Sequence, residues 1–166
     1  MLRVRMLRVT GVSMFEGLVL RAGSSADLEA ISALLTSMEL PIDGIEQWLP
    51  HFWVAESVQA IVGLAGVEVY GSSGLLRSVA VVPQWRGSGV ARTLVTRILE
   101  EARSAGCKDI YLLTTTADRY FPRLGFHTIG RNEVPAELHA SAELRGACPD
   151  TAVAMRRTLG ADSAIG

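Results

Sequence analysis

Apolar residues recur along the chain with two periods, one typical of amphipathic helices and one typical of strands. Residues 90–106 repeat apolar side chains at helical spacing and stop at Gly106, which predicts a helix with one buried face. Leucines and Ile31 recur at the same spacing after Ser24 and predict an earlier helix. Runs rich in β-forming residues predict strands at 17–23, 51–57, 60–71, 75–83, 108–116 and 151–159.

The order of these elements indicates a mixed α/β fold in one domain. A strand and a helix come first, a three-stranded meander follows, and the helix 90–106 then connects strands 75–83 and 108–116. A chain of 166 residues has the usual length of one domain. Residues 117–126 predict a short helix, whereas 127–150 contain proline breakers and are predicted to be irregular.

Charge and cysteine content exclude several classes of protein. The 16 Lys and Arg residues are balanced by 17 Asp and Glu residues, so the chain lacks the basic surplus typical of nucleic-acid-binding proteins. No apolar run approaches the ~18 residues of a membrane span. Cys107 and Cys148 are too few for a disulfide framework, which favours a reduced, cytoplasmic protein. Neither nucleic acid nor membrane is therefore expected as a partner.

The two ends of the chain differ in character from its middle. Residues 1–14 are basic and mildly apolar but lack the continuous apolar stretch and cleavage site of a signal peptide. The last residues, 160–166, are small and polar. We therefore expect a flexible N-terminal extension over 1–14, a domain over 15–159 and a flexible C-terminal tail over 160–166.

The loop PQWRGSGVA, residues 83–91, joins an apolar strand to the amphipathic helix. Gly87 and Gly89 come directly before the helix begins near Val90, where backbone N–H groups converge and attract anions such as phosphate. Arg86 adds positive charge. The P-loop pattern fails because a Lys-Ser or Lys-Thr pair is missing, and the dinucleotide fingerprint fails because its third glycine is missing. An ordinary turn with glycines for geometry alone is the alternative.

A third glycine-loop pattern fits. Gln84-x-x-Gly87-x-Gly89 resembles the Q/R-x-x-G-x-G/A signature of GNAT N-acetyltransferases, and the strand LRSVAVVP and the closing YFPRLGF lie in that family's order, over residues 17–159. The resemblance implies a single-domain α/β GNAT fold, with a mixed, mostly antiparallel sheet, a splayed strand pair and flanking helices. It also implies acetyl-CoA as co-substrate. GNAT enzymes often dimerise through their C-terminal strands, so a homodimer is a further expectation.

The same resemblance places acetyl-CoA on the strand and loop. The strand before the loop would hold the pantetheine arm through its free backbone groups, as an added strand would, and the loop would hold the pyrophosphate. The cofactor-binding residues expected on this basis are Val79, Ala80, Val81, Gln84, Trp85, Arg86, Gly87, Ser88, Gly89, Val90, Ala91, Arg92 and Phe121.

Direct acetyl transfer needs a group that takes a proton from the amine and one that gives a proton to the thiolate. Glu68 is the candidate base because it is a charged residue inside an apolar strand; the alternative is that it points to solvent. Many GNAT enzymes have a tyrosine where this chain has Phe121. Tyr120, one residue earlier, is the candidate acid, and protonation by water is the alternative.

Polar residues that interrupt apolar stretches are the candidates for binding the acceptor. Arg77 and Ser78 lie on the apolar strand just before the expected pantetheine site, and a buried arginine needs a partner. That partner is either an acidic group of the substrate or Glu68 in an internal ion pair. Glu39 belongs to the loop that walls the acceptor site in GNAT folds. The late stretch adds the polar candidates Arg131, Asn132, Glu133 and Ser141.

Further motifs narrow the resemblance. LLRS, LLTTTA and Cys148-Pro149 are similar to N-acetyltransferases of bacterial arsenic-resistance operons, and LTTTA with the later GF is similar to the acetyltransferase domain of N-acetylglutamate synthases. Both imply a small acceptor with an α-amino group and an acidic head, including amino-acid analogues that carry arsenic or phosphorus. A non-catalytic acyl-CoA-binding or regulatory module and a protein or peptide N-acetyltransferase are the alternatives.

No metal is expected in the site. The three histidines lack the spacing of a ligand pair, and the two cysteines lie far apart in the sequence, which disfavours a direct site for trivalent arsenic as well.

Overall fold

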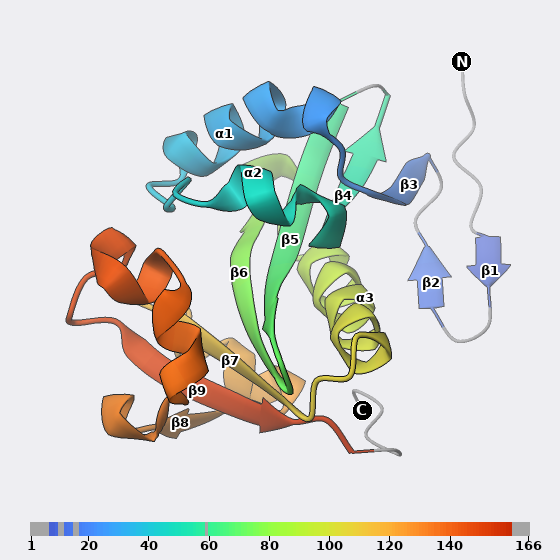
Figure 1. Cartoon of the computed structure of the whole chain (residues 1–166). Helices are drawn as coiled ribbons and strands as arrows, with labels where there is room; N and C mark the ends of the chain where they lie inside the picture. Colours follow the sequence, from blue (N-terminus) through green and yellow to red (C-terminus); the bar gives the residue numbers. More distant parts are fainter. Residues whose placement is uncertain (1–6, 10–11, 15–16, 59, 161–166) are drawn as a thin grey trace.

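In the computed structural model, the described residues are 7–9, 12–14, 17–58 and 60–160, and seven strands within them form one sheet (Figure 1). The strand order is β3-β4-β5-β6-β7-β9-β8, with β6 and β7 parallel and the other neighbours antiparallel. The strands are β3 (Leu18–Ala22), β4 (Phe52–Ser57), β5 (Ala60–Tyr70), β6 (Ser73–Val81), β7 (Asp109–Thr114), β8 (His127–Ile129) and β9 (Val153–Thr158). The predicted mixed, mostly antiparallel sheet is confirmed.

Helices cover both faces of the sheet. On one face lie α1 (Leu28–Ser37) and α2 (Ile45–Trp48), and on the other lies α3 (Val90–Ser104) (Figure 1). The two-residue period of β4 and β5 explains this arrangement, because successive side chains point to opposite faces. Val54 and Leu64 pack with the α1 side, whereas Ala55 and Ala65 pack with the α3 side.

The stretch 127–150 is more regular than the sequence predicts. It contains β8 at the edge of the sheet and the short helical segments η5 (Arg131–Glu133), η6 (Ala136–Ala140) and η7 (Glu143–Ala147). Each segment is too short to show a hydrophobic period, so the prediction of an irregular stretch was wrong there. Leu138, which is fully buried, packs with Leu75 and Tyr111 and fixes these segments against the sheet.

A second, two-stranded antiparallel sheet joins β1 (Leu7–Val9) and β2 (Val12–Met14) near the N-terminus (Figure 1). The remaining residues of the expected extension, 1–6 and 10–11, lie outside the described residues, as do 161–166 of the expected tail. The domain boundaries stay predictions.

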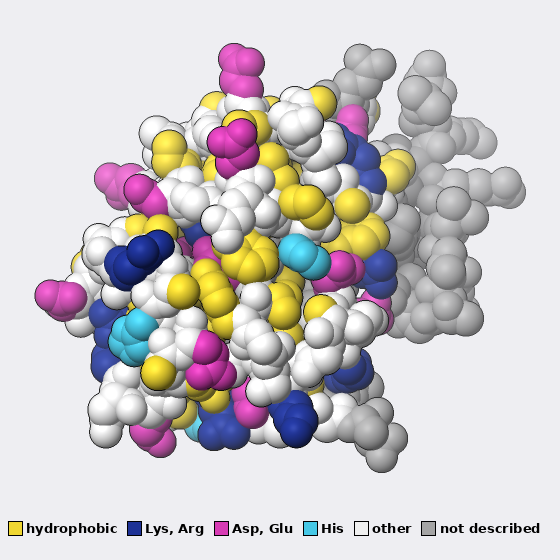
Figure 2. Space-filling model, viewed as in Figure 1, with side chains coloured by type: hydrophobic (Ala, Val, Ile, Leu, Met, Phe, Trp, Pro, Cys, Tyr) yellow, Lys and Arg dark blue, Asp and Glu magenta, His cyan; other side chains and the backbone are white. Residues whose placement is uncertain are grey.

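The surface in view carries charges of both signs. Figure 2 shows Asp and Glu side chains scattered among Lys and Arg, with apolar side chains between them. Among the described residues, no helix is long and apolar enough to cross a membrane.

Candidate active site

The sheet opens between its two parallel strands. The β6–β7 ladder runs from Ser73 and Asp109 to Leu75 and Tyr111, and within the described residues β6 beyond Leu75 pairs with β5 alone. The strands diverge from that point (Figure 1). The later half of β6 therefore presents an unpaired backbone edge inside the fold, where an extended ligand can add as a strand does.

A bulge in β6 accompanies the opening. Leu64 of β5 pairs with Ala80 and Gly66 pairs with Arg77, so β6 carries one residue more than β5 over this interval. Ser78 occupies the extra position with a φ of 58°, a left-handed conformation that is unusual for any residue but glycine. Bulges of this kind bend a strand and redirect its side chains, and here the bend separates β6 from β7.

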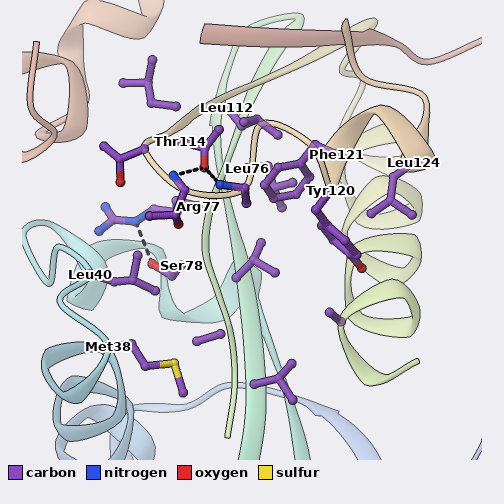
Figure 3. Close-up of a pocket in the computed structure, with 18 of the residues that line it drawn as sticks. Met38, Leu40, Leu76, Arg77, Ser78, Leu112, Thr114, Tyr120, Phe121 and Leu124 are labelled. Atoms are coloured by element: carbon purple, nitrogen blue, oxygen red, sulfur yellow. Dashed lines mark hydrogen bonds between the residues drawn. The ribbon is translucent and has the colours of Figure 1, made fainter. Parts of the chain in front are cut away.

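The opening holds a cavity of about 960 Å³. Figure 3 shows Arg77 and Ser78 on β6, with Met38 and Leu40 beside them and the ring of Tyr120 across the cavity. Glu39 also lines the cavity and is a second left-handed residue, with a φ of 56°. A left-handed conformation costs energy in a residue other than glycine and persists only where the surrounding fold holds it. Such residues are found most often at functional sites.

The glycine loop forms one end of this cavity. Gly87 and Gly89 have φ values of 74° and 89°, which glycine adopts freely, and Gly89 is the N-cap of α3. In the described part of the chain no side chain caps that helix, so its first N–H groups are available to a ligand. The Arg86 side chain donates to the carbonyl of Val81 at 3.1 Å, which holds the loop against β6.

Two aromatic residues close the cavity on the β7 side. Phe121 is buried edge-on between Tyr120 and Phe126, with ring centroids 5.4 Å and 5.7 Å away. Tyr120 is half-buried and lines the cavity. Burial raises the pKa of Tyr120, and the positive charges of Arg92 and Arg123 lower it to a smaller extent. The phenol therefore stays protonated at neutral pH and can donate a proton.

Arg77 is the centre of a buried network. Its side chain is 0% exposed, and its Nη1 donates to Glu68 Oε1 at 2.6 Å. Further donors reach the carbonyls of Asp43 and Pro41, at 2.8 Å and 3.3 Å, and Ser78 Oγ, at 3.2 Å. The internal ion pair with Glu68, one of the two alternatives left open by the sequence, is thus present. A role of Arg77 in binding substrate stays a prediction.

Glu68 is fully engaged. Its side chain is 1% exposed, which rules out the alternative that it points to solvent. Its second oxygen, Oε2, accepts a hydrogen bond from the Tyr70 hydroxyl at 2.6 Å. Burial and the neighbouring Glu68 carboxylate raise the pKa of Tyr70, so that hydroxyl stays a donor. Among the described residues, Glu68 is not part of the cavity wall.

A second carboxylate, missed by the sequence analysis, approaches Arg77 from the other side. Glu143, at the start of η7, lines the cavity, and its Oε1 lies 3.5 Å from Arg77 Nε. Its side chain is 5% exposed. Burial raises its pKa to about 7; Glu68 also raises it, whereas Arg77 and the Cys148 thiol lower it. The available signal was an acidic residue five positions before Cys148, but the sequence could not show that η7 folds back onto β6.

Most of the predicted site residues line this one cavity. Among those predicted to bind cofactor or substrate, the residues in the wall are Glu39, Arg77, Ser78, Val79, Ala80, Val81, Trp85, Arg86, Gly87, Gly89, Val90, Ala91, Arg92 and Phe121, together with the predicted acid Tyr120. Within the described chain, Gln84 and Ser88 lie outside the wall, and Ser88 Oγ instead donates to the Trp85 carbonyl inside the loop.

The late stretch contributes other residues than those expected. Within the described residues, the cavity wall does not include the predicted Arg131, Asn132, Glu133 and Ser141. Glu143, Ala147 and Cys148 line it instead. Burial and the nearby Glu143 carboxylate raise the pKa of the Cys148 thiol to about 12, so it is not a thiolate at neutral pH. Within the described residues, no group of His, Cys, Asp and Glu side chains is arranged to hold a metal ion.

Known proteins share this sequence pattern and fold. Residues 49–128 match the family described as acetyltransferase (GNAT) domain. The amino-acid acetyltransferase of Mycobacterium tuberculosis is 30% identical over 130 residues, which cover 72% of this chain and 74% of the relative. The amino-acid acetyltransferase of Neisseria meningitidis is 25% identical over 125 residues, and the match covers 29% of that longer protein.

Solved structures agree on the fold. The N-acetylglutamate synthase from Neisseria gonorrhoeae, complexed with coenzyme A and N-acetyl-glutamate, superposes with a TM-score of 0.74 at 22% identity, over 86% of this chain and 35% of that chain. A Mycobacterium tuberculosis structure in complex with CoA gives a TM-score of 0.71 at 23% identity, over 86% of this chain and 99% of that chain. The match to the GNAT domain and the 30% identity to the amino-acid acetyltransferase of Mycobacterium tuberculosis show that the chain belongs to the GNAT family of acetyltransferases.

Proposed function

We propose that the protein transfers the acetyl group of acetyl-CoA to the α-amino group of a small, acidic amino acid or amino-acid analogue. The observation that carries this proposal is the continuous cavity between β6 and β7. It joins a glycine-rich helix N-terminus, suited to a pyrophosphate, to a buried polar cluster of Arg77, Ser78 and Glu143, suited to a small polar acceptor.

The donor would lie along β6. Its pyrophosphate would accept hydrogen bonds from the first N–H groups of α3, with Arg86 and Arg92 nearby. Its pantetheine arm would pair with the backbone edge of β6 at Val79–Val81, where the Val81 carbonyl already accepts a hydrogen bond from Arg86. A backbone N–H on this edge would then polarise the thioester carbonyl as negative charge develops on its oxygen.

The acceptor would occupy the other end, between β6 and the loop that contains Glu39. The relatives named amino-acid acetyltransferase, and the neighbouring structure with N-acetyl-glutamate, support an amino acid as the acceptor class. An acidic head group has to share Arg77 with Glu68 and Glu143, because this guanidinium already serves both. An arsenic- or phosphorus-containing analogue presents the same α-amino group and a similar anionic head.

Chemistry would proceed by direct attack without an acyl-enzyme. The amine, once deprotonated, attacks the thioester carbon, the C–S bond breaks, and the sulfur takes a proton from Tyr120. The nitrogen gives up its remaining extra proton, which restores the Tyr120 hydroxyl through solvent. Positioning the amine against the thioester supplies much of the rate. A buried carboxylate bound to Arg77 takes the amine proton. Glu68, the base that the sequence predicts, is bound to Arg77, although it lies behind the described cavity wall.

An acceptor panel tests the proposal. The purified protein and acetyl-CoA are incubated with glutamate, other amino acids, phosphorus- and arsenic-containing analogues, and a peptide amine, and release of the CoA thiol is measured. We expect release with an acidic α-amino compound. Release with the peptide alone would indicate a protein acetyltransferase. No release, despite acetyl-CoA binding, would indicate a binding module, and either result would contradict the proposal.

The glycine loop provides a sharper test of donor binding. Gly87→Trp is expected to weaken acetyl-CoA binding at least ~10-fold, because an indole would fill the space at the end of the cavity. Gly71→Trp is the matched control. Gly71 also has a positive φ, 60°, and an added Cβ meets no described atom within 4 Å at either glycine. Titration calorimetry should find normal affinity for the Gly71 variant, and equal affinities for the two variants would argue against the pyrophosphate site.

A further inference from the structure

The buried cluster around Arg77 contains more negative than positive charge when all of its members are ionised. Arg77 carries one positive charge, whereas Glu68 and Glu143 each carry a carboxylate, at 2.6 Å and 3.5 Å from its nitrogens. All of these side chains are at most 5% exposed. In a site so poorly hydrated, an unbalanced charge is costly unless a proton or a cationic ligand neutralises it.

The two carboxylates differ in whether their oxygens are available to a ligand in the cavity. Glu68 has one oxygen on Arg77 and the other on the Tyr70 hydroxyl, so both are occupied. Glu143 lies farther from the guanidinium, at 3.5 Å, and is part of the cavity wall. The backbone N–H of Glu143 donates to Ser141 Oγ, which helps to hold the start of η7 in place.

We propose that Glu143 receives the ammonium group of the acceptor and takes its proton, while Glu68 and Tyr70 hold Arg77 in position beside it. This inference rests on the proposed function and assigns the base within it. The proton leaves the ammonium nitrogen for a carboxylate oxygen of Glu143, and the freed lone pair attacks the thioester carbon. The C–S electron pair goes to sulfur, which is protonated by Tyr120. The second proton on the new amide nitrogen leaves as the intermediate collapses and restores the Tyr120 hydroxyl through solvent, and the proton on Glu143 is released to solvent.

The charges around Glu143 support this role. Burial and Glu68 favour its neutral form, and Arg77 on β6 and the Cys148 thiol favour its ionised form. The positive charge of Arg131 lowers the pKa of Cys148, and that of Arg145 lowers the pKa of Tyr70, whose hydroxyl donates to Glu68. The balance places the Glu143 pKa at about 7, where a general base is most effective at neutral pH. Binding of an ammonium group would favour the ionised form further.

The test is the pH dependence of kcat/KM in matched variants. The wild-type profile should rise with pH through an apparent pKa near 7, because Glu143 must be ionised to accept the proton. Glu143→Gln should lower kcat about 100-fold or more, with an unchanged KM for acetyl-CoA, and should lose this limb of the profile. Glu143→Asp should restore part of the rate and the limb. Glu68→Gln should keep the limb, whatever its rate.

A spectroscopic readout separates a base from a structural carboxylate. In the wild type, an infrared carboxylic-acid C=O band should disappear as the pH rises through about 7, and Glu143→Gln should lack that band. An active wild type whose limb survives in Glu143→Gln but is lost in Glu68→Gln would overturn the assignment and leave the proposed function standing. A wild type that is inactive with every amine would overturn both.

Discussion

Replacing Arg77 by methionine is expected to lower the free energy of unfolding by about 3–5 kcal/mol at neutral pH. The aliphatic part of the side chain is kept, but Glu68 and Glu143 lose the guanidinium between them. Both carboxylates are then buried without a cation, which costs more than the ion pair itself contributes. The loss should shrink towards pH 5, because Glu143, whose pKa burial raises to about 7, takes up a proton as the pH falls.

Urea unfolding of the wild type and the variant at the two pH values measures this effect. Arg97→Met is the control, because the Arg97–Glu100 pair is exposed, at 39% and 48%, and the Arg97 guanidinium lies over the ring of Trp53. It should cost about 1 kcal/mol or less. A cost for Arg77→Met no larger than for Arg97→Met would show that the buried network does not matter to stability.

The same variant tests the role of Arg77 in binding. An unchanged KM of Arg77→Met for the acceptor would argue against Arg77 as part of the acceptor site.

Tyr120→Phe is expected to lower kcat about 100-fold while the KM for both substrates changes little. The substitution keeps the ring against Phe121 and removes the hydroxyl that protonates the departing thiolate. Because burial raises the Tyr120 pKa, the wild-type rate should not fall through loss of this proton until the pH is well above neutral.

Tyr111→Phe is the matched control for that experiment. Tyr111 is also buried, and its pKa is also raised by burial, but in the described structure it packs with Leu138 away from the cavity. Its variant should retain wild-type kcat. If Tyr120→Phe also retained kcat, water would be the proton donor, which is the alternative that the sequence leaves open.

Local patterns are enough to predict β3 to β7, β9 and the helices α1 and α3. The apolar period of residues 90–106 predicts α3, and the dense apolar run before Pro83 predicts β6. The glycine loop is local as well: Gly87 and Gly89 provide the positive φ values that the approach to α3 requires. Such features depend on neighbours in the sequence, so the sequence is sufficient to predict them.

The acceptor end of the cavity depends on contacts between distant segments. The extra residue at Ser78 that opens the sheet shows in the register of β5 and β6, not in either strand alone. Glu143 meets Arg77 only because η5, η6 and η7 pack their few apolar residues, such as Leu138, onto the sheet. The sequence predicted that Arg77 needs a partner, but it could not show that two carboxylates share it.

Acetyl transfer to a small amino acid is tested most directly by the product balance of one reaction. Acetyl-CoA and an acidic α-amino acid are incubated with the protein, and the free CoA thiol and the N-acetylated amino acid are quantified together, the latter by mass spectrometry. We expect both products to appear in equal amounts and Glu143→Gln to slow the formation of both alike. Thiol release without acetylated product, or no release with any amine, would contradict acetyl transfer to a small amino acid.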